Sequence, residues 1–167
     1  GSGRFISGSS LKLKESQFKQ DLNGDGVIDN QFDVYEQEGS VSLAKDASGN
    51  GFVKASGSSS YVALTGTDGS SRGDNTWDGW SLIGAETING INKTIWKSTA
   101  NTFWLANHNS SWVLNYAEGY PTGSELLSTE TDFQQDLNGD GVIGVEFTTT
   151  ENKGEILLVK DSSGNGF

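Results

Sequence analysis

Two acidic segments of the chain have the residue types and spacing of a site for a hard metal cation. The first, residues 21–29, places oxygen-bearing side chains at loop positions 1, 3, 5 and 9 and a glycine at position 6. This alternation directs successive side chains toward one centre, and the glycine permits the sharp turn between them. The expected ligands are Asp21, Asn23, Asp25, Asp29 and the backbone carbonyl of Val27.

The second segment, residues 136–144, repeats this pattern but has Gly144 in place of the acid at position 9. Its expected ligands are Asp136, Asn138, Asp140 and the backbone carbonyl of Val142. Both segments differ from the EF-hand at position 12, where phenylalanine replaces the usual bidentate glutamate. The missing carboxylate must come from elsewhere, and the candidates at equivalent places in the two copies are Glu36 and Glu151, or Glu15 and Glu130.

Calcium is the cation that this donor set favours. Carboxylate, amide and carbonyl oxygens are hard ligands, and neither segment contains the histidine or cysteine that zinc and copper prefer. Incomplete ligation suits the calcium-rich exterior of cells, where affinities of about 10⁻⁴ to 10⁻³ M suffice. The alternative is a pair of solvated Asx turns, but the pattern occurs twice in register, which favours calcium.

Residues 46–51 have the same spacing of oxygen-bearing residues, with Asp46, Ser48, Asn50 and then Gly51. The pattern recurs at residues 161–166. Positions 3 and 5 lack an acid, and the segment lies between two strand-like runs. We therefore interpret it as a β-turn rather than as a second metal site.

The two acidic segments belong to an internal repeat. Residues 21–52 align with residues 136–167 without a gap, and Asp136 stands 136 − 21 = 115 residues after Asp21. We interpret residues 1–20 as the helical end of a preceding repeat and residues 21–123 as a β unit that begins with a calcium loop. Residues 124–167 would then be a partial second copy that docks on the preceding unit or on another chain.

A short helix is expected before each loop and β-hairpins after it. Residues 124–135 predict a helix with Ser124 as N-cap and Glu125 in the first turn, and residues 9–20 predict its copy. Residues 40–55 predict a hairpin, and residues 80–87 and 91–97 predict another around Asn89-Gly90. Strands are also expected at residues 61–64, 102–107 and 111–116. The fold class is therefore mainly β, an antiparallel meander or sandwich-like unit.

Composition limits the possible partners. The chain has 22 acidic and 11 basic residues and a formal net charge of −11, which argues against nucleic acid and anionic membrane surfaces. It contains no cysteine, so a bound metal is the expected substitute for disulfides. No apolar run is long enough to span a membrane as a helix.

Aromatic residues follow the hairpin signals in a recognisable order. The positions concerned are Trp77 or Trp80, Ala85-Glu86-Thr87, Asn89-Gly90, Trp96-Lys97, Trp104, Trp112 and the segment from Phe133 to Gly144. Together they resemble the tryptophan-rich repeat at the C-terminal end of large cyanobacterial and marine bacterial exoproteins, with DxNxDG calcium loops of the dockerin and EF-hand kind. The resemblance implies tandem units in secreted or surface-anchored proteins and implies no defined activity.

Most of the five tryptophans are expected in the core, because a chain with 33% hydrophobic residues needs large side chains inside. Trp77 and Trp112 are the expected exceptions, since polar turns flank them, and they are the candidate ligand-binding residues. His108 is expected on a surface turn, outside any catalytic triad. Arg72-Gly73-Asp74 matches a cell-adhesion tripeptide that we attribute to chance.

The sequence thus predicts a calcium-binding structural repeat of a secreted bacterial cell-surface protein, such as an adhesin, surface-layer or filament component. Its expected partners are neighbouring repeats or copies of the same chain, and no enzymatic activity is expected. The alternative is a carbohydrate-binding module that uses exposed tryptophans, with a surface polysaccharide as partner.

Overall fold

The structure of the chain is a computed structural model that describes residues 6, 8–24, 32–74, 76–145, 147–151, 153 and 158–161. The chain divides into two compact units, residues 1–120 and residues 121–167. The acidic segment 21–29 falls in the first unit and the segment 136–144 in the second. Asp25, Val27 and Asp29, three expected ligands of the first loop, lie outside the described residues.

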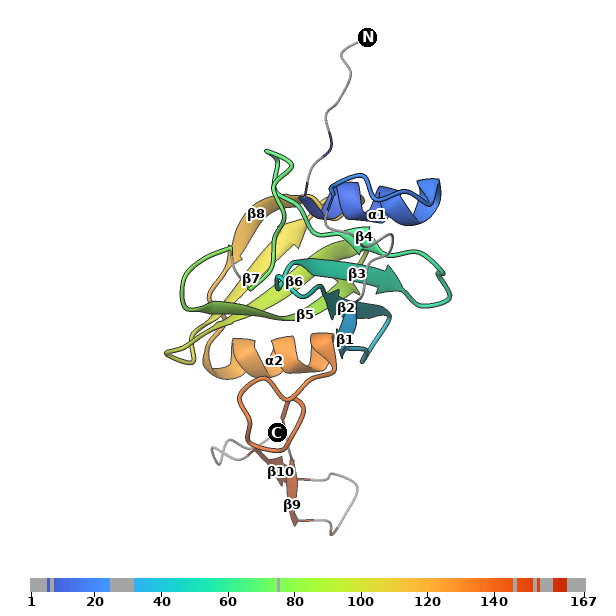
Figure 1. Ribbon diagram of the computed structural model, residues 1–167. Coiled ribbons are helices and arrows are strands. Elements are labelled where there is room, and N and C mark those ends of the chain that lie inside the picture. The colour runs from blue at the N-terminus through green and yellow to red at the C-terminus, as the bar shows by residue number, and fades with distance from the viewer. Residues whose placement is uncertain are drawn as a thin grey trace. The chain divides into compact units, whose positions relative to one another are not determined.

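The first unit contains a helix and two four-stranded antiparallel sheets (Figure 1). The helix is α1 (Gly8–Phe18), which packs near β4. One sheet has the order β1 (Asp33–Glu36), β2 (Val41–Lys45), β3 (Gly51–Ala55), β4 (Val62–Ala63). The other has the order β5 (Trp80–Ile88), β6 (Ile91–Ser98), β7 (Phe103–His108), β8 (Leu114–Gly119). Both are meanders, so the predicted mainly β fold is confirmed.

Local sequence explains the longest hairpin. Asn89 and Gly90 join β5 to β6 and have φ angles of 51° and 79°. Positive φ at both central residues is the geometry of the tight turn that matches strand twist, and Asn-Gly is the pair that adopts it most readily. The prediction of a hairpin around this pair is confirmed.

The core of the first unit lies between the two sheets. Buried side chains from β2, β3, β5 and β6 meet there, and Trp96 fills the centre with 1% of its surface exposed. Trp80 and Trp104 are partly buried against the same cluster. Burial of large aromatic side chains is the main source of stability that a lean composition has available. The expectation of a tryptophan-based core is confirmed.

The second unit contains the helix α2 (Gly123–Phe133), the acidic loop after it, and a two-stranded sheet of β9 (Thr148–Glu151) and β10 (Leu158–Lys160). The N-cap of α2 is Thr122, whereas Ser124 lies inside the first turn, so the predicted cap is wrong by two residues. Thr122 is extended, and its side chain makes no capping hydrogen bond. Glu125 lies in the first turn as predicted, where the helix dipole favours a negative charge.

Both helices end in the same way. Gln134 at the end of α2 and Lys19 after α1 have φ angles of 54°, the left-handed conformation that closes a helix. The two positions are related by the repeat offset. The sequence repeat is therefore also a repeat of backbone structure at these helix ends.

Two strands differ from expectation. β1 was not anticipated, because its residues follow the acidic loop without an apolar alternation that would mark a half-buried strand. β8 begins at Leu114 instead of near Ser111, because Trp112 has a φ angle of 59° that interrupts an extended backbone. Among the described residues, no helix has the length and apolar character needed to cross a membrane.

Candidate metal centre

The loop after α2 is built around the carboxylate of Asp136. Its Oδ1 accepts hydrogen bonds from the backbone N–H groups of Gly139 at 2.7 Å and Asp140 at 3.2 Å, and its Oδ2 accepts from Gly141 at 2.8 Å. The first residue of the loop thus folds the following backbone around its own side chain. Gly139 and Gly141 have φ angles of 84° and 90°, which glycine alone adopts without strain.

The other expected side-chain ligands of this loop lie in contact with each other. Asn138 Oδ1 accepts the backbone N–H of Asp140 at 2.7 Å, and its Nδ2 donates to Asp140 Oδ2 at 3.0 Å. Asp140 Oδ1 accepts the N–H of Val142 at 2.9 Å. Within the described part of the chain, no lysine or arginine pairs with Asp136 or Asp140. The loop therefore gathers two carboxylates and an amide oxygen with their negative charge uncompensated.

A buried glutamate on α2 fixes both ends of this loop. Glu130 is 0% exposed, and its Oε1 accepts the backbone N–H groups of Leu137 at 3.2 Å and Asn138 at 3.0 Å. Its Oε2 accepts the N–H of Gly144 at 3.1 Å. A buried carboxylate is costly unless such donors satisfy it, so these bonds hold the loop closed against the helix.

The first loop has the same arrangement where it can be compared. Asp21 Oδ1 accepts the N–H of Gly24 at 2.6 Å, as Asp136 does from Gly139. Glu15, 1% exposed on α1, accepts the N–H groups of Leu22 at 3.1 Å and Asn23 at 3.0 Å. The two copies thus share an anchoring glutamate in the preceding helix as well as the acidic pattern.

This role changes the interpretation of Glu15 and Glu130. They were candidates for the missing metal ligand, and the structure gives them another role, because backbone N–H groups donate to the Glu130 carboxylate and to Glu15 Oε1. Their hydrogen bonds join residues seven or more positions apart, and the spacing of ligands within a loop does not predict such bonds. The signal that could have found them is their equivalent position in the two copies.

Gly144, at loop position 9, is required by packing. It has a φ angle of 78°, and a side chain there would collide with Thr131 Oγ1 of α2. An acid at this position would strain the backbone and require Thr131 to move in the second loop, although the first loop has Asp29 there. Water or another residue must supply that part of any metal shell.

Neither of the remaining candidate ligands makes a described contact with a described residue of the two loops. Glu36 lies in β1, where its Oε1 accepts the backbone N–H of Glu38, and the side chain of Glu151 lies outside the described residues. No group of three histidine, cysteine, aspartate or glutamate side chains suited to a metal occurs in the described ranges. The donor set of the second loop, two aspartates with an asparagine and a carbonyl, nevertheless fits a hard cation with an open shell.

The segment at residues 46–51 is a hairpin turn, as interpreted from the sequence. Asp46 Oδ1 accepts the N–H groups of Ser48 at 2.9 Å and Asn50 at 3.0 Å. The side-chain amide of Asn50 donates to Asp46 Oδ2 at 2.9 Å. The carboxylate is buried and also lies 3.8 Å from Lys12 Nζ, so the turn satisfies its own charge.

The tryptophans at the predicted ligand positions differ from each other. Trp77 is 37% exposed, whereas Trp112 is 8% exposed and packs in the core. The expectation that Trp112 lies outside the core is therefore wrong. Its positive φ angle turns the indole inward from a loop whose neighbouring residues are polar and exposed.

His108 is also buried, at 5% exposure, so its expected position on a surface turn is wrong. Its Nδ1 lies 3.3 Å from the Trp112 carbonyl and its Nε2 lies 2.9 Å from Thr94 Oγ1. Since the carbonyl must accept, Nδ1 carries the proton and Nε2 accepts from Thr94, whose hydroxyl in turn accepts from the Trp96 indole N–H at 3.0 Å. Burial lowers the pKa of His108 to about 4.

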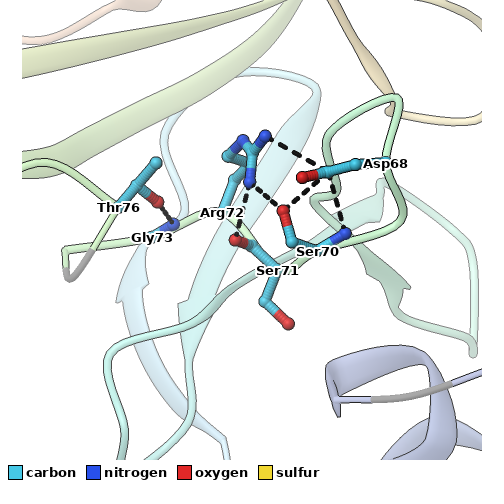
Figure 2. A network of polar contacts seen from close by, with 6 residues as sticks. All are labelled: Asp68, Ser70, Ser71, Arg72, Gly73 and Thr76. Carbon is cyan, nitrogen blue, oxygen red and sulfur yellow. Dashed lines mark hydrogen bonds and ion pairs between the residues drawn. The ribbon is translucent and has the colours of Figure 1, made fainter.

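The tripeptide Arg72-Gly73-Asp74 is engaged in internal contacts, and Figure 2 shows those of Arg72 and Gly73. The Arg72 guanidinium donates to Ser70 Oγ and to the Ser71 carbonyl, and it forms an ion pair with Asp68 at 3.4 Å. Gly73 donates its N–H to Thr76 Oγ1 at 2.7 Å, and Asp74 pairs with Lys45 at 2.9 Å. These contacts hold the segment between strands, and they support its interpretation as a chance match.

A third buried glutamate was missed from the sequence. Glu86 in β5 is 4% exposed, and its carboxylate accepts the backbone N–H groups of Ser40 and Val41, each at 2.7 Å. The bonds join β5 of one sheet to the start of β2 in the other. Glu15, Glu86 and Glu130 thus share one role, since each is buried and accepts backbone N–H groups.

The comparisons with known proteins agree with this architecture. Residues 41–144 match the family model described as the tryptophan-rich Synechocystis species C-terminal domain. The match begins at β2 and includes both the tryptophan-rich sheet and the anchored loop after α2. No curated protein and no solved structure gives a significant match.

Proposed function

The chain belongs to the family of tryptophan-rich Synechocystis species C-terminal domains, and we propose that it is a calcium-stabilised structural repeat of an exported bacterial surface protein. The observation that carries the proposal is the loop at residues 136–144. Asx turns fold its backbone around Asp136, Glu130 anchors both of its ends, and no basic residue described in the structure pairs with its aspartates. A hard divalent cation would relieve the charge that this arrangement concentrates.

The residues that would hold calcium are Asp136, Asn138, Asp140 and the carbonyl of Val142. Bound calcium would neutralise the two carboxylates and link the first and last parts of the loop. Because Glu130 already fixes the loop backbone, little further ordering is needed for binding. Asp21 and Asn23 would act in the same way in the first copy, next to Glu15.

The charge of the chain supports a role outside the cell. A net charge of −11 destabilises a compact state when calcium is scarce, and binding of calcium to the folded state would stabilise it after export. Repetition of the helix and loop at an offset of about one unit supports assembly in tandem, with neighbouring repeats or copies of the same chain as partners. An adhesin, surface-layer or filament protein would use such a module, and the proposal includes no enzymatic activity.

Thermal unfolding of the full chain tests this proposal. At a calcium concentration about 100 times the dissociation constant, binding should stabilise the folded state by about 2.7 kcal/mol relative to the same sample in EDTA. That corresponds to a rise in Tm of roughly 5 to 11 °C for a protein of this size. Magnesium at the same concentration should act more weakly, because it demands octahedral geometry. An equal Tm in calcium and in EDTA would contradict the proposal.

A further inference from the structure

A solvent-open hollow of about 400 Å³ lies at the turn that leads into β5 in the first unit. Its wall consists of the segment from Trp77 to Ser81 together with Asp74 and Thr99. The volume is in the range of small-molecule sites. Two indoles, two carboxylates and two hydroxyl groups thus surround one space in the first unit.

Trp77 packs against two other tryptophans and remains partly exposed. Its ring centroid lies 5.0 Å from that of Trp96 and 4.7 Å from that of Trp104, with interplanar angles of 73° and 89°. The centroids of Trp96 and Trp104 are themselves only 5.8 Å apart. Two rings so close together cannot lie on opposite sides of Trp77. The indole packs against both and still keeps 37% of its surface exposed.

The turn that carries the two indoles is also fixed. The N–H of Trp80 donates to the Trp77 carbonyl at 3.2 Å, and the N–H of Thr99 donates to the Gly79 carbonyl at 2.9 Å. Asp74 accepts from the N–H of Leu82 at 2.9 Å and from Lys45 Nζ at the same distance. A ligand would therefore meet a wall whose backbone is already ordered, which lowers the entropic cost of binding.

Several polar groups of this wall have no partner within the described part of the chain. They include the carboxylate of Asp78, which is exposed, and the indole N–H groups of Trp77 and Trp80. A carboxylate accepts hydrogen bonds and an indole N–H donates one. The hollow thus offers an aromatic surface with a donor and an acceptor beside it, which is the combination that sugar hydroxyls and the C–H face of a pyranose require.

We propose that this hollow binds a neutral pyranose unit of a polysaccharide, with Trp77 stacking on the sugar ring and Asp78 accepting hydrogen bonds from its hydroxyl groups. The net charge of −11 and the two aspartates in the wall disfavour sulfated and uronic-acid glycans. The proposal does not involve calcium, since the described residues that line the hollow belong to neither acidic segment. It adds a glycan-binding role to the structural repeat.

Isothermal titration of the full chain with soluble oligosaccharides tests the proposal. The probes are hexasaccharides of glucose with β-1,4 and β-1,3 linkages, a mannose hexasaccharide, a chitin hexasaccharide and, as an anionic comparison, a polygalacturonate oligomer. At least one neutral probe should bind with a Kd in the millimolar range or below, and the anionic probe should bind at least tenfold more weakly. The same affinity is expected in calcium and in EDTA for the folded chain.

Two substitutions locate the site. Trp77→Ala should weaken binding of the neutral probe at least tenfold, and Asp78→Asn should weaken it about tenfold through loss of a charge-assisted acceptor. Trp77→Ala could lose binding because the core is disturbed. Asp78→Asn avoids this ambiguity, because Asp78 is exposed. Tyr116→Ala, an exposed aromatic change on β8 outside the hollow, is the matched control and should leave the affinity unchanged.

The proposal is overturned if no neutral probe binds at 10 mM, or if binding is the same in Asp78→Asn as in the unsubstituted chain. Aromatic rings beside carboxylates could instead bind an organic cation, and a titration with choline tests this alternative. Choline binding that exceeds the affinity for every sugar would assign the hollow to cations and contradict the proposal.

Discussion

The turn at residues 46–51 and the loop at residues 136–144 begin with the same spacing of oxygen-bearing residues, yet they use it differently. In the turn, position 5 is Asn50, whose amide donates to the carboxylate of Asp46 at 2.9 Å. In the loop, position 5 is Asp140, a second carboxylate, and the first carboxylate receives only backbone N–H groups. The turn therefore satisfies its carboxylate with its own amide and with Lys12 of α1, whereas the loop has a second carboxylate at that position.

The comparison shows that spacing alone does not define a metal site. The residue at position 5 makes the difference. An asparagine amide there donates a hydrogen bond to the first carboxylate, whereas an aspartate adds a second negative charge that a cation can bind. The second difference is support from outside the segment. Glu130 holds both ends of the loop, whereas Asp46 of the turn is held by its own hairpin and by Lys12.

Removal of the hydrogen bonds from Glu130 to the loop should cause the largest loss of stability. Glu130→Gln replaces one acceptor oxygen with a donor beside buried N–H groups and should lower the free energy of unfolding by about 3 kcal/mol. Urea denaturation without calcium measures it. Glu125→Gln, an exposed change in the first turn of the same helix, should cost less than about 1 kcal/mol. Equal losses in the two variants would show that the loop does not depend on its anchor.

Mild acid should destabilise the tryptophan core through His108. The hydrogen bonds of this histidine go to Thr94 and to the Trp112 carbonyl, which are both uncharged. The pKa of His108 is lowered to about 4 in the folded state, below its ordinary value of 6.5. As pH falls below 6.5 the unfolded state therefore takes up the proton first, and stability is lost until the pH passes about 4. Between pH 7 and pH 5 the loss should be about 2 kcal/mol.

Chemical denaturation at a series of pH values measures this loss, and His108→Gln is the control. Glutamine can accept from Thr94 and donate to the Trp112 carbonyl without titrating, so its stability should change less over the same range. Parallel curves for the two proteins would contradict the assignment of the acid sensitivity to His108.

The smallest expected loss of stability comes from placing an aspartate at position 5 of the turn, as in the loop. Asn50→Asp removes the amide donor from Asp46 and places two carboxylates together, which should cost about 1 kcal/mol without calcium. Calcium should stabilise Asn50→Asp more than it stabilises the unsubstituted chain, and it should stabilise Asn50→Ala no more than the unsubstituted chain. Thermal melts of both variants with and without calcium make the comparison. Equal responses would show that position 5 does not decide cation binding.

The sequence predicted those features that depend on near neighbours. Asn89-Gly90 adopts the hairpin that its two residues favour, and both helices lie where the apolar pattern and Glu125 predicted them. The starting residue of α2 was wrong because Thr122 terminates the preceding extended backbone without a side-chain cap. Within the loop, the Asx turn of Asp136 follows from residues at most five positions apart.

Features that depend on distant contacts were not predictable in the same way. His108 has polar neighbours in sequence, but pairing of β7 with β6 places it beside Thr94, and the turn after β7 returns Trp112 to it. A glutamate in a strand pattern, such as Glu86, ordinarily faces solvent. Its burial becomes favourable only because the start of β2, 45 residues away along the chain, supplies N–H donors. No local pattern encodes such a partner.

Direct measurement of calcium binding tests the central claim most sharply. Isothermal titration of the full chain should show binding with a Kd of about 10⁻⁴ to 10⁻³ M. Asp140→Asn keeps the acceptor for Val142 but removes one charge, and it should weaken binding to the second loop at least tenfold. Asp132→Asn, which removes the same charge from an exposed position on α2, should bind as the unsubstituted chain does. No calcium binding, or equal affinity in Asp140→Asn and Asp132→Asn, would contradict the account.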